Sequence, residues 1–423
     1  MRATVDRAAR LRGVVRVPGD KSASHRALLL SALAEGTSHI DGLSPGEDVQ
    51  GTGVIIERLG AARQLDGERT VVTGGALRAA DGPLDCGNSG TTMRLVAGLV
   101  SGIDGEHVLV GDPSLSKRPM DRVAVPLRAM GALVSGAGER LCAPLRITGS
   151  STLRGIDYEV PVPSAQVKSA ILLAGLTALG PTIVHERVRT RTTTEDMLVL
   201  AGLSLESIDV GAGRRVELAP GRPLARDWRV PGDPSQAAFF AVLGAVHADA
   251  ELAVASIDVA PERSGFVGVL RRMGATVSFV DADGGTGLAA RSSSLTGTTV
   301  RAEEIPSVDE VPALTVAAAA ATGVTAFVAM GELRVKESDR FAGSMALASS
   351  LGCRVWSEGD DFFVEGLGSA KKFHHFEQRA VLDHRMVMAA AIAGAAGAGC
   401  VIDGAETVAT SYPTFFTHLD GLR

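Results

Sequence analysis

Residues 18–36 read PGDKSASHRALLLSALAEG. A polar loop containing proline, glycine and lysine leads into a leucine- and alanine-rich segment, which closes on a glycine. A glycine after the last apolar residue commonly ends an α-helix in the left-handed conformation. A helix that is apolar nearly all round is typical of burial on every side. The stretch therefore predicts a buried helix whose N-terminus carries a polar loop.

The same unit recurs along the chain. Its copies begin at Pro18, Asp85, Pro163, Pro231, Pro306 and Asp383, and five of the apolar helices close on Gly36, Gly102, Gly180, Gly323 and Gly397. A second, amphipathic helix recurs in phase and ends in a glycine before a strand. These glycines are Gly60, Gly131, Gly202, Gly274, Gly352 and Gly421. Two markers with one period predict six α/β repeats of about 70 residues each.

The length of the chain favours two domains of three repeats. At 423 residues it exceeds one ordinary core. If three repeats are related by a pseudo-three-fold axis, their buried helices run parallel and their N-termini share one face, which attracts anions. The loops at those N-termini carry Lys21, Ser22, Asn88, Gly90, Ser164, Gln166, Asp309 and Arg385.

Composition excludes several classes of protein. The net charge of −6 argues against a general nucleic-acid or membrane-surface binder, and aromatic residues at 4% leave few platforms for stacking bases. The four cysteines show no C-x-x-C spacing and indicate free thiols in a reducing compartment. No secretory signal opens the chain and no apolar run reaches the length of a membrane span, so we expect a cytoplasmic protein.

Four loops carry candidate chemistry, and each also has a purely structural explanation. Residues 18–26 combine a lysine, hydroxyls and an arginine suited to phosphate or carboxylate, but also fit a capped helix with solvated cations. Gly90 permits close approach of a ligand, or simply a tight turn. Lys117 and Arg118 are adjacent cations that, alone, favour solvated surface. Residues 334–340 alone favour an exposed helix with internal ion pairs.

Taken together, the motifs resemble one family. PGDKSASHRALLLSALAEG, GNSGTTMR, GDPSLSKRPM, PSAQVKSA, DEVPAL, RVKESDR and DHRMVMA occur in the order and spacing of the 5-enolpyruvylshikimate-3-phosphate (EPSP) synthases, also called 3-phosphoshikimate 1-carboxyvinyltransferases. The resemblance covers nearly the whole chain. It implies a two-domain inside-out α/β barrel of six repeats, three per domain. The domains would be residues 1–20 plus 231–423 and residues 21–230, joined at two crossovers, with the active site in the interdomain cleft.

The resemblance also implies the reaction and its partners. The enzyme would transfer the enolpyruvyl group of phosphoenolpyruvate to the 5-hydroxyl of shikimate 3-phosphate, in the shikimate pathway to aromatic amino acids, with no cofactor or metal and as a monomer. By motif position, shikimate 3-phosphate would be held by Lys21, Ser22, Arg26, Ser164, Ala165, Gln166, Arg191, Asp309 and Lys336. Phosphoenolpyruvate would be held by Lys21, Gly90, Arg118, Gln166, Arg340 and Arg385.

Both addition and elimination move a proton, so one acid/base pair can serve twice. The resemblance assigns Asp309 as the base at the hydroxyl and Glu337 as the proton donor to the methylene carbon, with Lys21 bridging the substrates. Asp309 can also be explained as a turn residue before Pro312.

Some positions depart from one branch of the family. Ala165 stands where a second serine often follows Ser164, Lys168 replaces an aromatic position, and Thr410 stands where that branch has a lysine. These choices are similar to the SAQVKSA-bearing subgroup, but they leave the last phosphate contact open. Because Gly90 leaves space in the phosphoenolpyruvate pocket, we expect glyphosate to inhibit.

Three alternatives were compared with this prediction. A sibling transferase acting on UDP-N-acetylglucosamine carries a cysteine in the loop matching residues 111–120, which has none here. A non-catalytic paralogue or scaffold predicts missing acids or cations, yet the motifs retain them. A metal hydrolase would need a ligand spacing that the nine histidines do not show.

Overall fold

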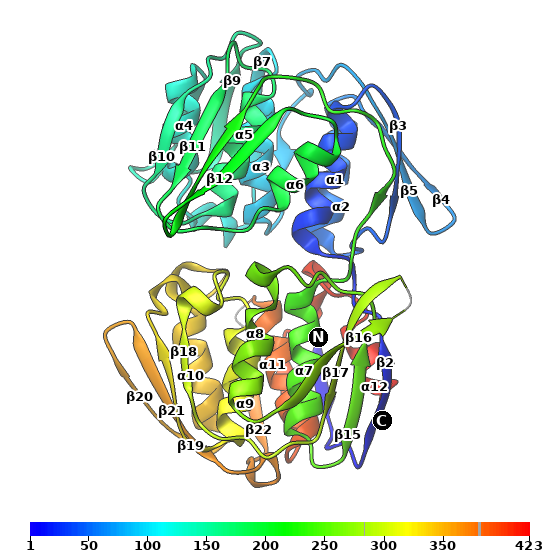
Figure 1. The fold of residues 1–423 in the computed structure, drawn as a ribbon, viewed down its shortest axis with the longest axis vertical. Coiled ribbons are helices and arrows are strands. Elements are labelled where there is room, and N and C mark those ends of the chain that lie inside the picture. Colours follow the sequence, from blue (N-terminus) through cyan, green and yellow to red (C-terminus); the bar gives the residue numbers. More distant parts are fainter. Residues whose placement is uncertain (283, 380–381) are drawn as a thin grey trace. The chain divides into compact units, whose positions relative to one another are not determined.

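The computed structural model describes residues 1–282, 284–379 and 382–423, which form two compact units. Unit 1 comprises Met1–Asp20 and Pro231–Arg423, and unit 2 comprises Lys21–Val230. Figure 1 shows helices and sheets alternating in both units. Each unit contains three sheets. The predicted fold class, a two-domain inside-out α/β barrel built from six repeats, is confirmed.

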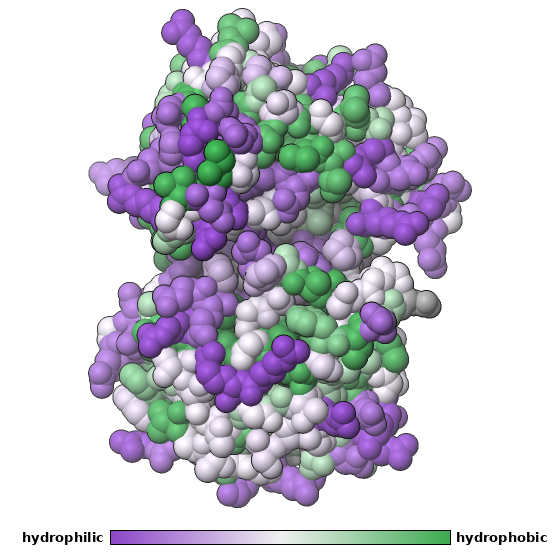
Figure 2. Space-filling model, viewed as in Figure 1, coloured by the Kyte–Doolittle hydropathy of each residue, from purple (hydrophilic) through white to green (hydrophobic). Residues whose placement is uncertain are grey.

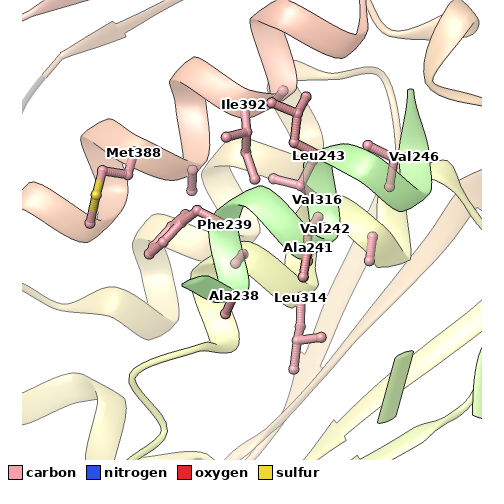
Figure 3. Packing of buried hydrophobic residues seen from close by; sticks show 14 of the residues in the cluster. Ala238, Phe239, Ala241, Val242, Leu243, Val246, Leu314, Val316, Met388 and Ile392 are labelled. Carbon is pink, nitrogen blue, oxygen red and sulfur yellow. The ribbon is translucent and has the colours of Figure 1, made fainter. Parts of the chain in front are cut away.

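The apolar helices form the centre of each unit. In unit 2 they are α1 (Lys21–Leu33), α3 (Gly90–Ser101) and α5 (Ala165–Gly175), and in unit 1 they are α7 (Pro234–Val246), α9 (Val311–Ala320) and α11 (His384–Ala396). Every residue of α7, α9 and α11 is buried. The side chains of these three helices meet in one cluster, where Phe239, Val316 and Ile392 lie together (Figure 3). Helices that are apolar all round are thus buried on every side, as predicted.

The second helix of each repeat lies outside the centre. These helices are α2 (Glu47–Arg58), α4 (Asp121–Met130), α6 (Thr193–Leu200), α8 (Pro261–Arg272), α10 (Arg340–Ser350) and α12 (Phe415–Asp420). Short 3₁₀ helices lie at Leu115–Lys117, Ala302–Glu304, Gly331–Val335, Ala370–Lys372 and Ala405–Thr410. α2 buries Ile55 and Ile56 but exposes Val54, as its amphipathic pattern predicts.

The glycines that close these helices only partly follow the prediction. Of the six after the outer helices, five have positive φ, and Gly421 at −68° does not. Of the five after the central helices, Gly36, Gly180 and Gly323 have positive φ. The left-handed expectation is wrong at Gly102 and Gly397, whose φ angles are −93° and −108°. A Cβ at either would collide with Thr177 or Phe373, so close packing requires the glycine there.

Five of the six sheets share one four-stranded topology, and the sixth has three strands among the described residues. In unit 2 their orders are β14 (Trp228–Arg229)-β3 (Gly36–Asp41)-β5 (Arg69–Gly74)-β4 (Ala62–Asp66), β6 (Leu84–Asp85)-β7 (Gly105–Val110)-β9 (Cys142–Gly149)-β8 (Leu133–Ala137), and β10 (Asp157–Val160)-β11 (Thr182–Glu186)-β13 (Gly213–Leu218)-β12 (Leu205–Val210). In unit 1 they are β16 (Thr276–Ala282)-β17 (Gly285–Arg291)-β15 (Ala250–Val254)-β2 (Leu11–Val15), β18 (Thr299–Arg301)-β19 (Thr322–Val328)-β21 (Asp361–Leu367)-β20 (Arg354–Glu358), and β1 (Arg2–Val5)-β23 (Cys400–Asp403)-β22 (Phe376–Arg379).

In four repeats the strand before the central helix pairs in parallel with the strand after it, as a β-α-β crossover requires. The other two repeats exchange this leading strand. β2 precedes α1 in the chain but pairs with β15 of unit 1, and β14 precedes α7 but pairs with β3 of unit 2. The two crossovers between the units therefore lie between β2 and α1 and between β14 and α7.

The described surface carries scattered exposed hydrophobic residues. On the face seen in Figure 2, hydrophilic residues surround scattered hydrophobic ones. Exposed hydrophobic side chains such as Leu65, Leu133 and Ile208 belong to separate sheets, and single exposed hydrophobic residues are normal. Within the described ranges, every helix is too short or too polar to cross a bilayer.

A buried arginine anchors both crossovers in unit 1. Asp20 donates its N–H to the carbonyl of Pro231 at 2.7 Å, and Asp233 donates to Pro18 at 2.9 Å. Arg263 of α8 contacts the carboxylates of both Asp20 and Asp233. Burial alone would lower the pKa of Arg263, but these carboxylates outweigh burial and raise it. Arg263 therefore remains charged.

We expect Arg263→Ala to destabilise unit 1 by about 3–5 kcal/mol, because it leaves two buried carboxylates without their cation. The measurement is urea unfolding followed by circular dichroism. Arg272→Ala is the matched control: Arg272 lies on the same helix, but its pair with Glu304 is partly exposed, and it should cost under about 1 kcal/mol. Equal losses from the two variants would contradict the anchoring role.

Candidate active site

The N-termini of the central helices of unit 2 gather polar groups. α3 packs against both α1 and α5, and Gly90 and Ala165 are the first residues of α3 and α5. The hydroxyls of Ser89 and Ser164 accept hydrogen bonds from the backbone of the first turns, at 3.1 and 3.3 Å. Helix N-termini carry partial positive charge and favour anions. This face of unit 2 is therefore suited to phosphate or carboxylate.

Arg26 lies at the centre of a first cluster on this face. It is 3% exposed, and its guanidinium donates to the hydroxyl of Thr194 at 2.5 Å and to that of Ser169 at 2.7 Å. It also donates to the carbonyl of Ser22 at 2.7 Å. Arg191 donates to the Ser22 hydroxyl at 3.4 Å. Folding thus brings together three residues that the sequence assigned from separate segments: Ser22, Arg26 and Arg191.

Gly90 and Arg118 belong to a second cluster. A Cβ at Gly90 would lie 2.8 Å from Arg94 Nη1 and 3.2 Å from Arg118 Nη1, so two guanidinium groups border this glycine. Arg94 donates to Gln166 Oε1 at 2.7 Å, and Arg118 donates to Asn88 Oδ1 at 2.9 Å. Side-chain amides therefore help to orient both guanidinium groups beside Gly90.

Lys21 and a chain of hydroxyls connect the helices beneath this face. Lys21 Nζ forms an ion pair with Asp48 of α2. His25 is fully buried, and its Nδ1 lies 2.8 Å from the hydroxyl of Thr52, which lies 2.9 Å from that of Thr92. Burial, followed by the charges of Lys21 and Arg26, holds the pKa of His25 well below its usual range. The imidazole is therefore neutral at neutral pH.

In unit 1 the candidate residues gather around Arg340, the first residue of α10. Its guanidinium lies 2.9 Å from Asp309, 2.6 Å from Glu337 and 2.8 Å from Asp383. Arg385 lies 3.5 Å from the other oxygen of Asp309. Burial would lower the pKa of Arg340, but the three carboxylates raise it. Arg340 therefore fixes both proposed acid/base residues, Asp309 and Glu337, with one permanent charge.

Strained backbone precedes two residues of this cluster. Val308, before Asp309, has φ +50°, and Leu382, before Asp383, has φ +49°. Left-handed conformations are costly for residues other than glycine, typically about 1–3 kcal/mol, and occur where surrounding contacts enforce them. The ion pairs with Arg340 supply such contacts at both carboxylates.

Three residues that the sequence singled out make only local described contacts or offer only backbone groups. The described ion pair of Lys336 is with Glu332 at 3.8 Å. Ala165 is partly buried at the start of α5 and offers only backbone polar groups. Thr410 bonds to the carbonyl of Thr407 within its own 3₁₀ helix.

Sequence reasoning missed several residues that contact the assigned ones in the two units: His25, Asp48, Arg94, Ser169, Thr194 and Asp383. Arg94 and His25 lie in the motifs GNSGTTMR and PGDKSASHR, each one turn from an assigned residue, and Thr194 lies one turn after Arg191, so this spacing is a usable signal. Asp48 carries no such signal, because only tertiary packing brings it to Lys21.

Two other features lie outside these clusters. A cavity of about 470 Å³ is lined by Leu33, Gly102 and Leu176, at the C-terminal ends of α1, α3 and α5, opposite their N-terminal face. In the described part of the chain, no three histidine, cysteine or acidic side chains are grouped so that they could hold a metal ion. Cys142 Sγ lies 3.6 Å from the carbonyl of Lys117, so folding brings a cysteine beside a loop that has none.

Comparison with known proteins identifies the family. The model of the EPSP synthases (3-phosphoshikimate 1-carboxyvinyltransferases) matches residues 5–419. The chain belongs to this family. A 3-phosphoshikimate 1-carboxyvinyltransferase from Herpetosiphon aurantiacus is 40% identical over 99% of this chain and 98% of its own. One from Rhizobium johnstonii is 42% identical over 99% and 96%.

Comparison with solved structures finds the same fold in an EPSP synthase and in a second enolpyruvyl transferase. An EPSP synthase from Acinetobacter baumannii superposes with a TM-score of 0.86 at 36% identity, covering 100% of this chain and 98% of its own. The enolpyruvyl transferase NikO from Streptomyces tendae shares the fold at 18% identity, with a TM-score of 0.79 over 99% and 96% of the two chains. The predictions of an EPSP synthase-family enzyme, a transferase of the shikimate pathway, are confirmed, and the family is favoured over the UDP-N-acetylglucosamine alternative.

Buried His25 makes the free energy of unfolding of unit 2 depend on pH. Its folded pKa lies below the unfolded value of about 6.5, so below that pH the unfolded chain binds a proton that the folded chain rejects. The contribution of His25 to the free energy of unfolding is fully present above about pH 6.5. It falls as the pH drops towards the folded pKa, by at most about 1.4 kcal/mol per pH unit. From pH 7 to pH 5, we expect wild type to lose up to about 2 kcal/mol more than His25→Asn, measured by urea unfolding. Parallel losses would contradict a neutral buried His25.

Proposed function

We propose that this chain transfers the carboxyvinyl group of phosphoenolpyruvate to the 5-hydroxyl of shikimate 3-phosphate and releases inorganic phosphate. The observation that carries the proposal is the N-terminal face of unit 2, where Lys21, Arg26, Arg94, Arg118 and Arg191 surround three helix starts. Each substrate carries a phosphate and a carboxylate, so a site for both must neutralise several negative charges. An ion pair at about 4 Å contributes ~4 kcal/mol at an effective dielectric constant near 20.

Shikimate 3-phosphate is assigned to the cluster around Arg26. The shared contacts of Ser22, Arg26 and Arg191 support this assignment, since a planar guanidinium and a hydroxyl together suit a phosphate monoester. Ser164 and Gln166, at the start of α5, are assigned to the same substrate. Ala165 is assigned through its backbone, and Lys336 through its charge.

Phosphoenolpyruvate is assigned to the cluster around Gly90. Arg118 borders Gly90, and Gln166 contacts Arg94, which supports an anion site at the start of α3. Arg340 and Arg385 of unit 1 are assigned to the same substrate. Because they belong to the unit that holds Asp309 and Glu337, we propose that residues of both units act on one pair of substrates and that shikimate 3-phosphate binds first.

The chemistry is addition followed by elimination. Asp309 takes the proton of the 5-hydroxyl as its oxygen bonds to C2 of phosphoenolpyruvate, and Glu337 donates a proton to C3, giving a tetrahedral adduct that retains the phosphate. Glu337 then removes a proton from C3 as the C2–O bond to phosphate breaks, and Asp309 returns its proton to the leaving phosphate, so both carboxyl groups regain their starting states. Lys21 balances charge on both substrates. The contacts of Arg340 with both carboxylates support this division, because they hold two proton carriers around one cation.

Asp309→Asn and Glu337→Gln should each lower kcat about 100-fold or more while changing the affinity for shikimate 3-phosphate only a few-fold, since the amides keep the shape but cannot carry the proton. The measurements are phosphate release with both substrates, each omitted in turn, and calorimetry for binding. Glu332→Gln, beside Lys336 but outside the Arg340 cluster, is the control. Wild-type protein that releases no phosphate would overturn the proposed function.

Glyphosate should inhibit competitively with phosphoenolpyruvate, because Gly90 leaves space beside two guanidinium groups. Gly90→Ala places a Cβ against Arg94 and Arg118, so we expect weaker binding of both glyphosate and phosphoenolpyruvate. Inhibition curves at several phosphoenolpyruvate concentrations test both statements. Unchanged wild-type activity at millimolar glyphosate would refute the first.

Four finer expectations stay predictions: membership of the SAQVKSA-bearing subgroup, a monomeric state, a cytoplasmic location and independence of cofactors. Size-exclusion chromatography with light scattering tests the oligomeric state. Activity after dialysis against a chelator tests the requirement for a metal. UDP-N-acetylglucosamine, offered in place of shikimate 3-phosphate, tests the sibling reaction.

A further inference from the structure

A fully buried ion triad lies beneath the loop that carries Arg191. Lys168 of α5 is 0% exposed, and its Nζ lies 2.8 Å from Glu186 at the end of β11 and 2.6 Å from Glu195 in the first turn of α6. The side chains of Glu186 and Glu195 are 1% and 3% exposed. The mechanism above uses none of the three residues.

The triad encloses one segment of chain. Residues 187–192 connect β11 to α6, so Lys168 binds the carboxylate before this segment and another just after it. Thr190, inside the segment, donates its hydroxyl to Glu186. One lysine therefore secures both ends of the loop, and Glu186 secures its middle.

The same elements carry the partners of Arg26. Ser169 follows Lys168 on α5, and Thr194 precedes Glu195 on α6, and both contact the Arg26 guanidinium. Their hydroxyls also lie 2.6 Å from each other. A shift of α6 relative to α5 would move Thr194 and Arg191 together, so the triad controls the geometry of the whole cluster.

Stability alone does not explain such a triad. Removing three charged groups from water is costly, and apolar replacement of a buried ion cluster is often neutral or stabilising. Burial and the charge of Glu186 raise the pKa of Glu195, although Lys168 opposes that shift. What charged groups add is a specific geometry, because close ion pairs tolerate few arrangements.

We propose that Lys168, Glu186 and Glu195 are positioning residues, which hold Arg191 and Thr194 in the geometry that binds the phosphate of shikimate 3-phosphate. The inference rests on the proposed function for the identity of the ligand. The anchoring of residues 187–192 is independent of any substrate.

The test is a charge-free triple variant, Lys168→Met with Glu186→Gln and Glu195→Gln, which keeps the side-chain volumes. We expect it to fold and to melt within a few degrees of wild type. Losing the orientation of one charged contact should raise KM for shikimate 3-phosphate roughly 10-fold to 100-fold, with kcat and KM for phosphoenolpyruvate changed less than about 3-fold. Amide hydrogen exchange over residues 187–192 should become faster.

Arg187→Met is the matched control. Arg187 belongs to the same loop, but its pair with Glu159 is exposed at the surface, so both kinetics and exchange should stay at wild-type values. If the triple variant does not fold, Glu195→Gln alone removes one charge and keeps the shape. A several-fold rise in KM for shikimate 3-phosphate is then expected.

Unchanged KM and unchanged exchange in a folded triple variant would overturn the inference, because a merely structural triad predicts that result. Failure of the proposed function is distinct: wild type would release no phosphate. The exchange experiment would then still decide whether the triad anchors the loop, since it uses no substrate. Faster exchange in the triple variant supports anchoring, and equal exchange refutes it.

Discussion

The burial of apolar helices on every side is the constraint from which the rest of the structure follows. Such a helix is stable in water only when other elements surround it, and each fully buried Leu contributes about 1.5–3 kcal/mol. Leu28, Leu29 and Leu30 of α1 are at most 1% exposed. This burial offsets the cost of enclosing Arg26 one turn earlier, and it brings the starts of α1, α3 and α5 to one face.

The two units use charge in opposite ways. In unit 2, hydroxyls and amides help to orient Arg26, Arg94 and Arg118. In unit 1, three carboxylates surround Arg340, so its charge serves to hold acids in place. Anion binding and proton transfer need these different environments. Under the proposed function, unit 2 supplies most of the anion contacts, and unit 1 supplies the proton carriers together with Arg340 and Arg385.

The chain passes from one unit to the other at the two strands that pair outside their own repeat, β2 and β14. β2 and β14 pair in the unit opposite to that of the helix that follows each of them. Both crossovers therefore pass Gly19 and Gly232, which pair with each other. Arg263 fixes the flanking carboxylates of Asp20 and Asp233. Lys21 begins α1 directly after this anchor, so the position of one binding residue depends on it.

The sequence by itself determined the six repeats, the buried and amphipathic helices, the family and most of the charged residues of the clusters around Arg26, Gly90 and Arg340. The helices depend on patterns within about 20 residues, where periodicity and capping act. The repeats and the family depend on motifs that recur in a fixed order along the chain. Tertiary structure alone decided that Asp383 shares Arg340 with Asp309 and Glu337, that Asp48 pairs with Lys21, and that Lys168 binds two glutamates. It also decided the strand exchange. The reason is physical: these contacts join residues from different repeats or elements, and only packing of the folded chain sets which distant side chains meet.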